Sequence, residues 1–525
     1  NLLYYYMKLK HSFFYSILTS IFLSLSWPAY GFVFFVFFSL VPLLYFEYKT
    51  DFCFRKLFFP VFVSFLLWNL FTTYWIMYSS LPGMLIAVFL NSLFMSCVFI
   101  SYSFIRRKTN LKTGLFSLIF LWISFEFLHY NWDLSWSWLT LGNVFSNSTY
   151  LIQWYEFTGV LGGTLWILLS NILIFLFVLK RNKKFVFAFG ALFVFLFVLS
   201  IYSKNENLAE QKIDVIIVQP NIDPWEDKFS NMTVEDQVNV FVNLAKSKID
   251  KNVDFIVAPE TFLYDNLWED GIEYSPTIKL LTSNFHQFPN LNFIVGATTL
   301  KRVYDKDTLK FSAKRISGTD IFYEFFNSLI YIKDDNSIKI HKKSKLVPGT
   351  EIIPLPFIFG KLSKIFENMG GVSSSLGKGN KISVFKQDSI CFSTSICYES
   401  IFGESISRSF QQGSQCLFVI TNDGWWKDSP GYKQHLSYSR LRAIENRKPI
   451  IRCANTGISC FIDHNGKVIK KTNWWTKDSI REQIVLNDKL TFYSMHGDYL
   501  GRVSVFLSFM IVIYSFVFIK IKSKN

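Results

Sequence analysis

The sequence predicts an α-helical transmembrane bundle of eight helices joined to one large extracytoplasmic α/β domain. Half of the chain is hydrophobic and 59 of its 525 residues are phenylalanine, which is too apolar for an ordinary soluble protein. Apolar runs that approach or reach the length of a membrane-spanning helix account for the excess. They cover residues 12–27, 30–46, 57–79, 84–105, 114–130, 159–179, 185–202 and 503–519.

A long segment of mixed composition separates the last two runs and is large enough for a domain with its own core. We therefore expect the first seven transmembrane helices in 1–205, the outer domain in 206–495, and the eighth helix with its tail in 496–525. The chain begins at Asn1, and Met7 is a candidate for the true start. No A-x-A-like site follows the first run, so we expect a retained helix there and not a cleaved signal peptide.

The placement of basic residues predicts the orientation in the membrane. Loops on one side of the predicted bundle are rich in lysine and arginine, whereas loops 27–30, 80–83 and 131–158 contain none. Because basic loops stay in the cytoplasm, we expect both termini there and the large domain outside. The basic residues beside the spans are Lys8, Lys10, Lys49, Arg55, Lys56, Arg106, Arg107, Lys108, Lys112, Lys180, Arg181, Lys183, Lys184, Lys520, Lys522 and Lys524. They hold much of the excess positive charge, so a nucleic-acid partner is not expected.

The outer domain shows the pattern of a layered α/β fold with mixed sheets. Runs such as KIDVIIVQP, VDFIVAPE and CLFVITN are nearly continuously apolar, as strands covered on both faces are. Segments with helical spacing alternate with them, and MTVEDQVNVFVNLAKSKI carries a threonine cap signal. DHNG before KVI is typical of a hairpin turn, so part of the sheet structure is antiparallel.

Five of the seven cysteines lie in the outer domain: Cys391, Cys397, Cys416, Cys453 and Cys460. In an oxidising compartment an odd number leaves at least one thiol unpaired, which permits a functional thiol. Five reduced, buried cysteines that act as small hydrophobic residues are the alternative.

Three candidate catalytic residues follow predicted strands, where the loops of an open α/β sheet converge. Glu260 ends FIVAPE, Lys343 lies in HKKSKLVPGTE, and Cys397 lies in SICYE. Each alone has an ordinary explanation, as a cap carboxylate, a solvated cation or a core thiol. Together they supply what covalent acyl transfer needs, which is a thiol nucleophile, a carboxylate base and a cation for the oxyanion.

The order of these three residues resembles the nitrilase superfamily of carbon–nitrogen hydrolases. The segments VQPNI, KSKLVP, SICYE, TNDGWW and RLRAIENRKPIIRCANTG carry the resemblance. A nitrilase-like domain over 210–490, with seven spans before it and one after, looks like the apolipoprotein N-acyltransferase branch. The resemblance implies an α-β-β-α sandwich for the outer domain and a bacterial inner-membrane location with the catalytic domain in the periplasm.

By this resemblance, Glu260, Lys343 and Cys397 form a catalytic triad. Cys397 takes an acyl chain from a phospholipid as a thioester, and the α-amine of a diacylglyceryl-modified apolipoprotein cysteine then receives it, in a ping-pong reaction that ends lipoprotein maturation. Glu260 is the general base, which must not be locked in an ion pair, and Lys343 stabilises the oxyanion. The expected partners are the phospholipid, the apolipoprotein and the bilayer, and the protein is expected to act as a monomer.

Supporting residues are implied in the same way. We expect Glu351 and Glu399 to orient Lys343 and its neighbours, and Tyr398 and Trp225 to shape the mouth of the pocket. A solvated loop carboxylate is the alternative for Glu399, and core packing is the alternative for Trp225.

Lys342 and Lys345 are rivals for the lysine role, but the spacing to Leu346-Val347-Pro348 favours Lys343. VPGTE departs from the Pro-Phe-Gly-Glu order that is usual in this loop of the family, while Lys343 and Glu351 keep their register. No metal-ligand spacing and no phosphate-binding glycine loop are present in the sequence, so no cofactor is expected.

Five further residues have a structural interpretation or two open interpretations. Arg442, Glu445, Arg452 and Asn455 are interpreted as ties between a helix and the strand after it. Glu126, near the outer end of the fifth run, is either functional or an interfacial carboxylate.

The outer loop 131–158 is rich in aromatic residues, namely Trp132, Trp136, Trp138, Trp154 and Tyr155. We expect it at the headgroup level, as the wall of a lateral entrance for lipid, with a plain interfacial belt as the alternative. Replacing these tryptophans with serine is expected to slow lipid turnover more than it lowers stability.

Two other functions compete with acyl transfer. A membrane-anchored nitrilase-type amidohydrolase needs only one span, which leaves the remaining helices unexplained. A transporter with a large binding domain is expected to show paired repeats and charges at the membrane midplane, and neither is convincing in the sequence.

Overall fold

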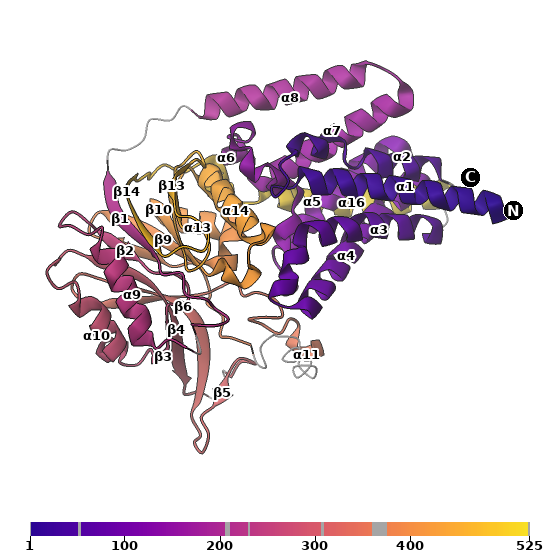
Figure 1. Cartoon of the computed structure of the whole chain (residues 1–525). Helices are drawn as coiled ribbons and strands as arrows, with labels where there is room; N and C mark the ends of the chain where they lie inside the picture. Colours follow the sequence, from indigo (N-terminus) through magenta and orange to yellow (C-terminus); the bar gives the residue numbers. More distant parts are fainter. Residues whose placement is uncertain are drawn as a thin grey trace. The chain divides into compact units, whose positions relative to one another are not determined.

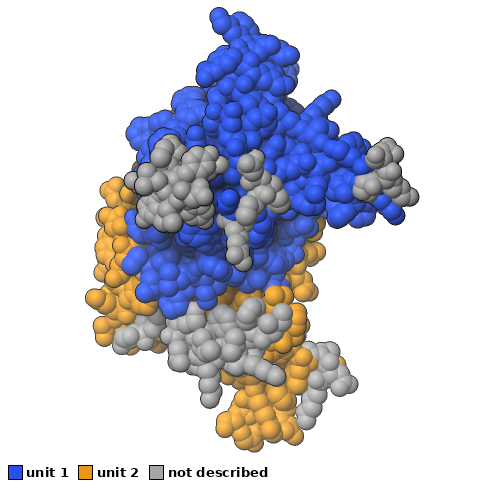
Figure 2. All heavy atoms as spheres, turned by 90° about the vertical axis from the view of Figure 1, so that its right-hand side faces the viewer, with its two compact units in different colours: residues 1–77, 81–205, 496–525 blue, residues 78–80, 206–495 orange. Residues whose placement is uncertain are grey.

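The computed structural model describes residues 2–50, 54–204, 211–228, 231–305, 309–359 and 375–522, and of residues 2–11 and Arg55 it describes the backbone alone. The chain divides into two compact units (Figures 1 and 2). Unit 1 comprises Asn1–Met77, Leu81–Asn205 and His496–Asn525, and unit 2 comprises Tyr78–Ser80 and Glu206–Met495.

Unit 1 is helical, and its last helix comes from the C-terminal end of the chain. Its α-helices are α1 (Leu2–Ser26), α2 (Val41–Lys49), α3 (Phe54–Thr73), α4 (Leu81–Lys108), α5 (Leu111–His129), α6 (Tyr155–Thr158), α7 (Val160–Lys180), α8 (Lys184–Ser203) and α16 (Tyr499–Lys522). Short 3₁₀ helices join them at η1 (Val33–Phe38), η2 (Tyr74–Tyr78), η3 (Ser137–Leu139), η4 (Leu141–Asn147) and η5 (Thr149–Leu151). The helix α16 packs against α5 and α4, and the hydroxyls of Ser508 and Ser124 are 2.9 Å apart. The two ends of the sequence therefore build one helical unit.

Within the described ranges, six helices are long and apolar enough to cross a membrane, and Ser12–Ser26 forms a shorter apolar helix. The predicted span over 30–46 differs, because it folds as η1 followed by the nine-residue α2. Pro42 lies at the start of α2, where a proline fits, and the Leu40 N–H freed at the break donates to Asn171 Oδ1 of α7 at 2.7 Å. A break in an apolar segment is tolerated because a neighbouring helix supplies the missing partner.

The tryptophans of segment 131–158 correct an expectation. Trp138 and Trp154 are buried inside unit 1, and Trp138 packs on Trp75 with ring centroids 5.0 Å apart. Trp132 is exposed at 39%. The expectation that all of these rings line an entrance for lipid is therefore wrong for Tyr155, which is fully buried, and for Trp138 and Trp154. Their replacement by serine would remove core contacts, so it would lower stability directly.

Unit 2 contains two sheets with helices on their outer faces. The first sheet has the order β14-β1-β2-β4-β6-β5, with β3 beside β4 and β7 beside β6, and the second has the order β13-β12-β11-β10-β9-β8. The strands of the first sheet are β1 (Lys212–Gln219), β2 (Phe255–Val257), β3 (Leu263–Trp268), β4 (Asn292–Val303), β5 (Lys314–Arg315), β6 (Phe322–Ile332), β7 (Ile338–Lys342) and β14 (Asp478–Val485). Those of the second are β8 (Val384–Gln387), β9 (Ile390–Ile396), β10 (Cys416–Thr421), β11 (Ile450–Ala454), β12 (Cys460–Ile462) and β13 (Val468–Lys471). Parallel and antiparallel pairs occur in both sheets, as predicted.

The packing of unit 2 gives four layers in the order α-β-β-α. Alternate residues of β1 face opposite sides, so Ile213 and Ile217 pack between the sheets whereas Ile216 packs under α9 (Val234–Lys246) and α10 (Pro276–Ser283). The outer face of the second sheet packs on α13 (Gly403–Phe410) and α14 (Pro430–Asn446). The short helices α11 (Pro356–Phe359) and α15 (Phe492–His496) complete the described helices. The region between the sheets is thus the core that supports the strand ends.

The five cysteines of unit 2 have free thiols. Cys416, Cys453 and Cys460 are buried in strands, as expected for small hydrophobic residues, whereas Cys391 and Cys397 are half-buried.

Glu126 of α5 is a hydrogen-bond hub inside unit 1. Its carboxylate accepts from the Leu141 N–H at 2.8 Å, the Thr164 hydroxyl at 2.7 Å and the Trp122 indole N–H at 3.0 Å. It therefore fixes the start of η4 to α5 and α7, which favours a structural role.

We expect Glu126→Ala to lower the stability of the protein by about 3 kcal/mol or more, because three buried donors lose their acceptor. Glu126→Gln keeps one acceptor oxygen and is expected to lose less. Thermal unfolding in detergent measures both. The control is Asp133→Asn, which replaces an exposed carboxylate shortly after the end of α5. Equal midpoints for Glu126→Ala and Asp133→Asn would contradict the structural role.

Candidate active site

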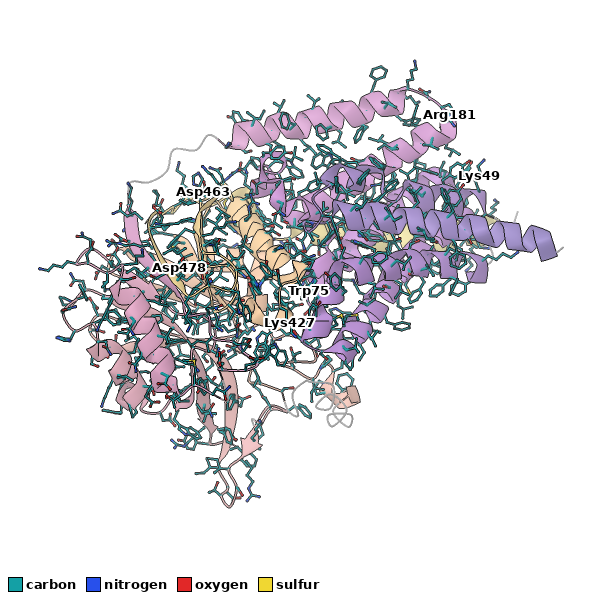
Figure 3. The ribbon with its side chains drawn as sticks, viewed as in Figure 1. Lys49, Trp75, Arg181, Lys427, Asp463 and Asp478 are labelled. Carbon is teal, nitrogen blue, oxygen red and sulfur yellow. The ribbon has the colours of Figure 1, made fainter. Side chains whose placement is uncertain are left out.

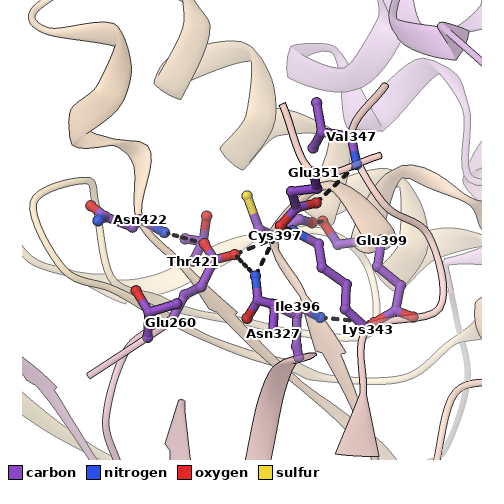
Figure 4. Close-up of polar contacts among 12 residues, drawn as sticks. Glu260, Asn327, Lys343, Val347, Glu351, Ile396, Cys397, Glu399, Thr421 and Asn422 are labelled. Atoms are coloured by element: carbon purple, nitrogen blue, oxygen red, sulfur yellow. Dashed lines mark hydrogen bonds and ion pairs between the residues drawn. The ribbon is translucent and has the colours of Figure 1, made fainter. Parts of the chain in front are cut away.

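The three predicted catalytic residues converge at the ends of strands from both sheets (Figure 4). Glu260 follows β2, Lys343 directly follows β7, and Cys397 directly follows β9. The first two strands belong to one sheet and β9 belongs to the other. The site is therefore assembled where the two sheets meet, on backbone held by ladder hydrogen bonds.

Lys343 is a buried ammonium shared by two carboxylates. Its Nζ lies 2.8 Å from Glu351 Oε1 and 3.2 Å from Glu260 Oε1, and the residue is 1% exposed. Burial acts to lower the pKa of Lys343, but the charges of Glu351 and Glu260 outweigh it and hold the pKa above its usual value. Lys343 is therefore a fixed positive charge at any physiological pH.

The side chains of the two other candidate lysines have different partners. Lys342 pairs with Glu269 at 2.7 Å and lies over the Phe326 ring, and Lys345 lies over the ring of Phe402. In the loop with the unusual VPGTE order, Glu351 still reaches Lys343, and its Oε2 also accepts from the Val347 N–H at 2.9 Å. The choice of Lys343 and the orienting role of Glu351 agree with this geometry.

Glu260 is held at both carboxylate oxygens. Oε2 accepts from the backbone N–H of Asn422 at 3.0 Å, and Oε1 accepts from Asn327 Nδ2 at 2.8 Å as well as from Lys343. The expectation that Glu260 avoids an ion pair is therefore not met. Lys343 makes its shorter contact with Glu351, so its ammonium is shared between the two carboxylates and is not paired with Glu260 alone.

Asn327 is a buried neighbour of the cluster that the sequence did not indicate. Its Nδ2 bridges Glu260 Oε1 and Glu351 Oε1, at 2.8 and 3.0 Å. Asn327 sits in β6, in the otherwise mostly apolar run FFNSLIYI, and is 6% exposed. A buried amide in such a strand needs partners, and this was the signal that could have identified it.

Cys397 occupies a strained turn. It has φ of +49°, in the left-handed region that non-glycine residues rarely adopt, and it starts the 3₁₀ helix η9 (Cys397–Ile401). Burial, followed by the negative charge of Glu260, raises the pKa of its thiol, whereas Lys343 and a hydrogen bond with Thr421 act to lower it. The resting sulfur is therefore protonated, and it needs a base to become a nucleophile.

Glu399 ties the nucleophile turn to the lysine loop. Its Oε1 accepts from the N–H and hydroxyl of Ser344, and its Oε2 accepts from the Ile396 N–H at 3.0 Å and contacts His341 Nε2 at 2.9 Å. Burial acts to raise the pKa of Glu399, but His341 and these hydrogen bonds outweigh it and hold the pKa below its usual value. Glu399 thus orients the residues beside Lys343 and Cys397, and the alternative of a solvated loop carboxylate is wrong.

A second buried network lies beneath Cys397. Asp423 pairs with Arg452 at 2.6 Å and with His435 Nδ1 at 2.9 Å, and His435 Nε2 lies 3.2 Å from the Cys397 carbonyl oxygen. Potential ligand atoms of Cys397, Asp423 and His435 lie within 4.8 Å of one another. Arg452 already neutralises this carboxylate, so the donor set fits a positioning network and does not fit a cation site.

The residues interpreted as structural ties connect more than one helix and strand. Arg442 of α14 donates to the Ile401 carbonyl oxygen at 2.9 Å and pairs with Glu445 at 3.0 Å. Asn455 exchanges hydrogen bonds with the backbone of Ile222. Arg452 contacts Asp423, as described above, so it belongs to the support of the nucleophile turn.

Trp225 and Tyr398 lie in different surroundings. Trp225 is 49% exposed, packs edge-to-face on Trp425, and lines a cavity of about 580 Å³ with Trp474 and Trp475. Tyr398 is buried and packs edge-to-face on Phe402. Tyr398 therefore supports the nucleophile turn from inside the domain, which corrects its expected place at a pocket mouth.

Comparison with known protein families gives a match for each of the two parts of the chain. Residues 214–488 match the family model described as carbon-nitrogen hydrolase, which is more than half of the chain. Residues 19–173 match the model described as the apolipoprotein N-acyltransferase N-terminal domain.

Two relatives match along nearly their whole length. The apolipoprotein N-acyltransferase of Chlorobaculum tepidum is 29% identical over 94% of this chain and 95% of its own. That of Thermotoga maritima is 26% identical over 96% of this chain and 94% of its own. Among solved structures, Saccharomyces cerevisiae Nit3, a member of branch 10 of the nitrilase superfamily, is 17% identical with a TM-score of 0.38, over 56% of this chain and 95% of that one.

The charges around Cys397 predict opposite effects on its titration and on its chemistry. We expect Glu260→Gln to let the thiol ionise at lower pH, because a neighbouring negative charge is lost, while enzyme activity falls about 100-fold or more. Lys343→Met is expected to shift the titration upward. The pH dependence of Cys397 alkylation, followed by peptide mass spectrometry with Cys397→Ala as the blank, measures both. An unchanged titration in Glu260→Gln would contradict this arrangement of charges.

Proposed function

The chain belongs to the carbon-nitrogen hydrolase family, and we propose that within this family it is an apolipoprotein N-acyltransferase. The observation that supports this most strongly is the combination of a Glu260–Lys343–Cys397 cluster with a unit of long apolar helices in one chain. Relatives that match over both parts have this activity in their names.

In the first half-reaction, the Cys397 sulfur attacks the ester carbonyl of a phospholipid acyl chain. Glu260 takes the thiol proton as the carbon–sulfur bond forms, and then gives it to the alkoxide of the departing lysophospholipid. The Lys343 ammonium stabilises the negative oxygen of the tetrahedral intermediate, a contribution of about 3–4 kcal/mol for a donor of this kind. The product on the enzyme is a thioester at Cys397.

In the second half-reaction, the α-amine of a diacylglyceryl-modified N-terminal cysteine attacks the thioester carbonyl. Glu260 accepts a proton from the amine, the carbon–sulfur bond breaks, and the leaving thiolate recovers the proton from Glu260. Both half-reactions thus use the same three side chains. The products are an N-acylated lipoprotein and the free enzyme.

Both substrates are lipids, which gives the helical unit a physical purpose. Removing an acyl chain from a bilayer into water costs about 0.8 kcal/mol per CH₂ group, so a catalyst held at the membrane avoids a prohibitive penalty. We propose a multi-pass protein of the bacterial inner membrane with domain limits at 1–205, 206–495 and 496–525, which the two compact units support.

We further propose cytoplasmic termini, a periplasmic catalytic domain and a monomeric enzyme. Figure 3 supports the orientation, since Lys49 and Arg181 lie at one end of the helices of unit 1 and Trp75 lies at the other. Basic residues gathered at one end of the helices are what the positive-inside rule leads us to expect of the cytoplasmic side.

An acyl-enzyme is the expected outcome when the purified protein meets phospholipid vesicles. Intact mass should rise by one fatty acyl group in the wild type, and Cys397→Ala should show no adduct. Adding a diacylglyceryl-modified lipopeptide should remove the adduct and acylate the amine of the peptide.

A membrane-bound amidohydrolase would instead release free fatty acid or ammonia and leave the lipopeptide unmodified. An unchanged mass in the wild type, or full lipoprotein maturation by Cys397→Ala, would overturn the proposed function.

A further inference from the structure

A second buried lysine contacts the main chain of the proposed catalytic base. Lys228 is 2% exposed, and its Nζ donates to the carbonyl oxygen of Glu260 at 3.1 Å and to the hydroxyl of Thr261 at 2.7 Å. Lysine is rarely buried, because its ammonium loses hydration unless the protein replaces it. The mechanism above gives Lys228 no part in bond making.

The segment that Lys228 holds is strained and tightly enclosed. Thr261 has φ of +48°, which is unusual for a β-branched residue. Behind it lies Gly296 of β4, where a β-carbon would overlap the Pro259 carbonyl oxygen and lie 2.7 Å from the Glu260 Cα. The turn therefore fits only against a glycine, and it needs outside restraint to persist.

The anchor of Lys228 is itself fixed. Its backbone N–H donates to the Asp223 carbonyl oxygen at 2.9 Å, and its own carbonyl oxygen accepts from the buried Gln237 of α9 at 2.9 Å. A lysine side chain is normally flexible, but here both ends are held. The ammonium can therefore transmit the position of α9 to the Glu260–Thr261 turn.

We propose that Lys228 is a positioning residue for acyl transfer, whose ammonium holds the strained Glu260–Thr261 turn and so keeps the Glu260 carboxylate facing Lys343 and Cys397. This inference rests on the proposed function, because it takes Glu260 as the general base. In this way the segment before α9 contributes to catalysis by positioning Glu260, and it need not touch the substrate.

Charge gives the ammonium a second effect. The groups that face the Glu260 carboxylate are Lys343 from the β7 loop, Glu351 from the loop after it, and Cys397 after β9. Lys228 adds a positive charge on the main-chain side of Glu260, which favours the ionised carboxylate that a general base must be. Burial lowers the pKa of Lys228 to about 7, and the negative charge of Glu260 acts against this lowering. The side chain is therefore an ammonium below this pH and loses its charge as the pH rises through it.

The test compares Lys228→Met with Lys246→Met in the full-length protein in phospholipid vesicles. Lys246 is an exposed lysine of α9, so its replacement removes a charge from the same region without touching the turn. We expect Lys228→Met to slow formation of the acyl-enzyme about 10-fold to 100-fold, because small misplacements of a catalytic group cost this much. The KM for phospholipid should change less than about twofold, since Lys228 does not touch substrate.

The pH profile separates this role from a purely structural one. In Lys228→Met, the pH at which acylation is half-maximal on the acidic side should move upward, because the carboxylate is protonated more easily once a positive charge is lost. Lys246→Met should match the wild type in rate and profile. A folded Lys228→Met protein with wild-type acylation and profile, or with a loss confined to KM, would overturn the proposal.

Thr261→Val covers the case in which Lys228→Met fails to fold. Valine keeps the shape of threonine and removes only the hydroxyl that Lys228 contacts, so acylation should slow about threefold to tenfold in a protein that still folds. The unfolding temperature should fall as well, because the buried ammonium loses one of its acceptors. Wild-type acylation in Thr261→Val would overturn the proposal in that case. Normal acylation by Glu260→Gln would instead refute the proposed function, which keeps the two failures distinct.

Discussion

The proposed active site depends on one buried ammonium and the negative charges that make it stable. Lys343 has almost no contact with solvent, so its positive charge requires Glu260 and Glu351 within ion-pair distance. Two carboxylates and one ammonium would leave an excess negative charge beside a thiol that must ionise. Lys228, on the main-chain side of Glu260, offsets that excess. The neighbouring carboxylates have partners of their own, since Asp423 pairs with Arg452 and Glu399 contacts His341.

This balance explains why so much of the surrounding structure consists of hydrogen bonds to backbone. The N–H groups of Asn422, Val347, Ser344 and Ile396 all donate to carboxylates of the cluster. Main-chain donors cannot rotate away as side chains do, so they hold each oxygen at a fixed place before a substrate arrives. The double-sheet core contributes to catalysis in this sense, because Ser344, Ile396 and Asn422 lie at or just after the ends of its strands.

The sequence predicted the two parts of the molecule and the three central residues. Continuous apolar runs indicated the central strands of both sheets but not the more polar strands β3, β5, β7, β8 and β14. The positions of Glu260, Lys343 and Cys397 after strands indicated where they would meet. Asn327 and Lys228 were missed because their roles are defined by contacts across long stretches of chain, to Glu351 and to Glu260. The break between η1 and α2 was missed for a similar reason, because its stability comes from Asn171 of a distant helix. Spacing along the chain does not reveal such partners. A polar residue in a buried setting indicates only that a hydrogen-bond partner must exist somewhere.

The protonated state of Cys397 has a consequence for survival in an oxidising compartment. Disulfide exchange and oxidation to sulfenic acid both start from the thiolate, so a sulfur that keeps its proton until substrate arrives reacts slowly with disulfide-forming catalysts and peroxides. If the domain is periplasmic, as proposed, this side chain meets such agents throughout the life of the protein. The same arrangement of charges that delays ionisation then also slows oxidation of the thiol.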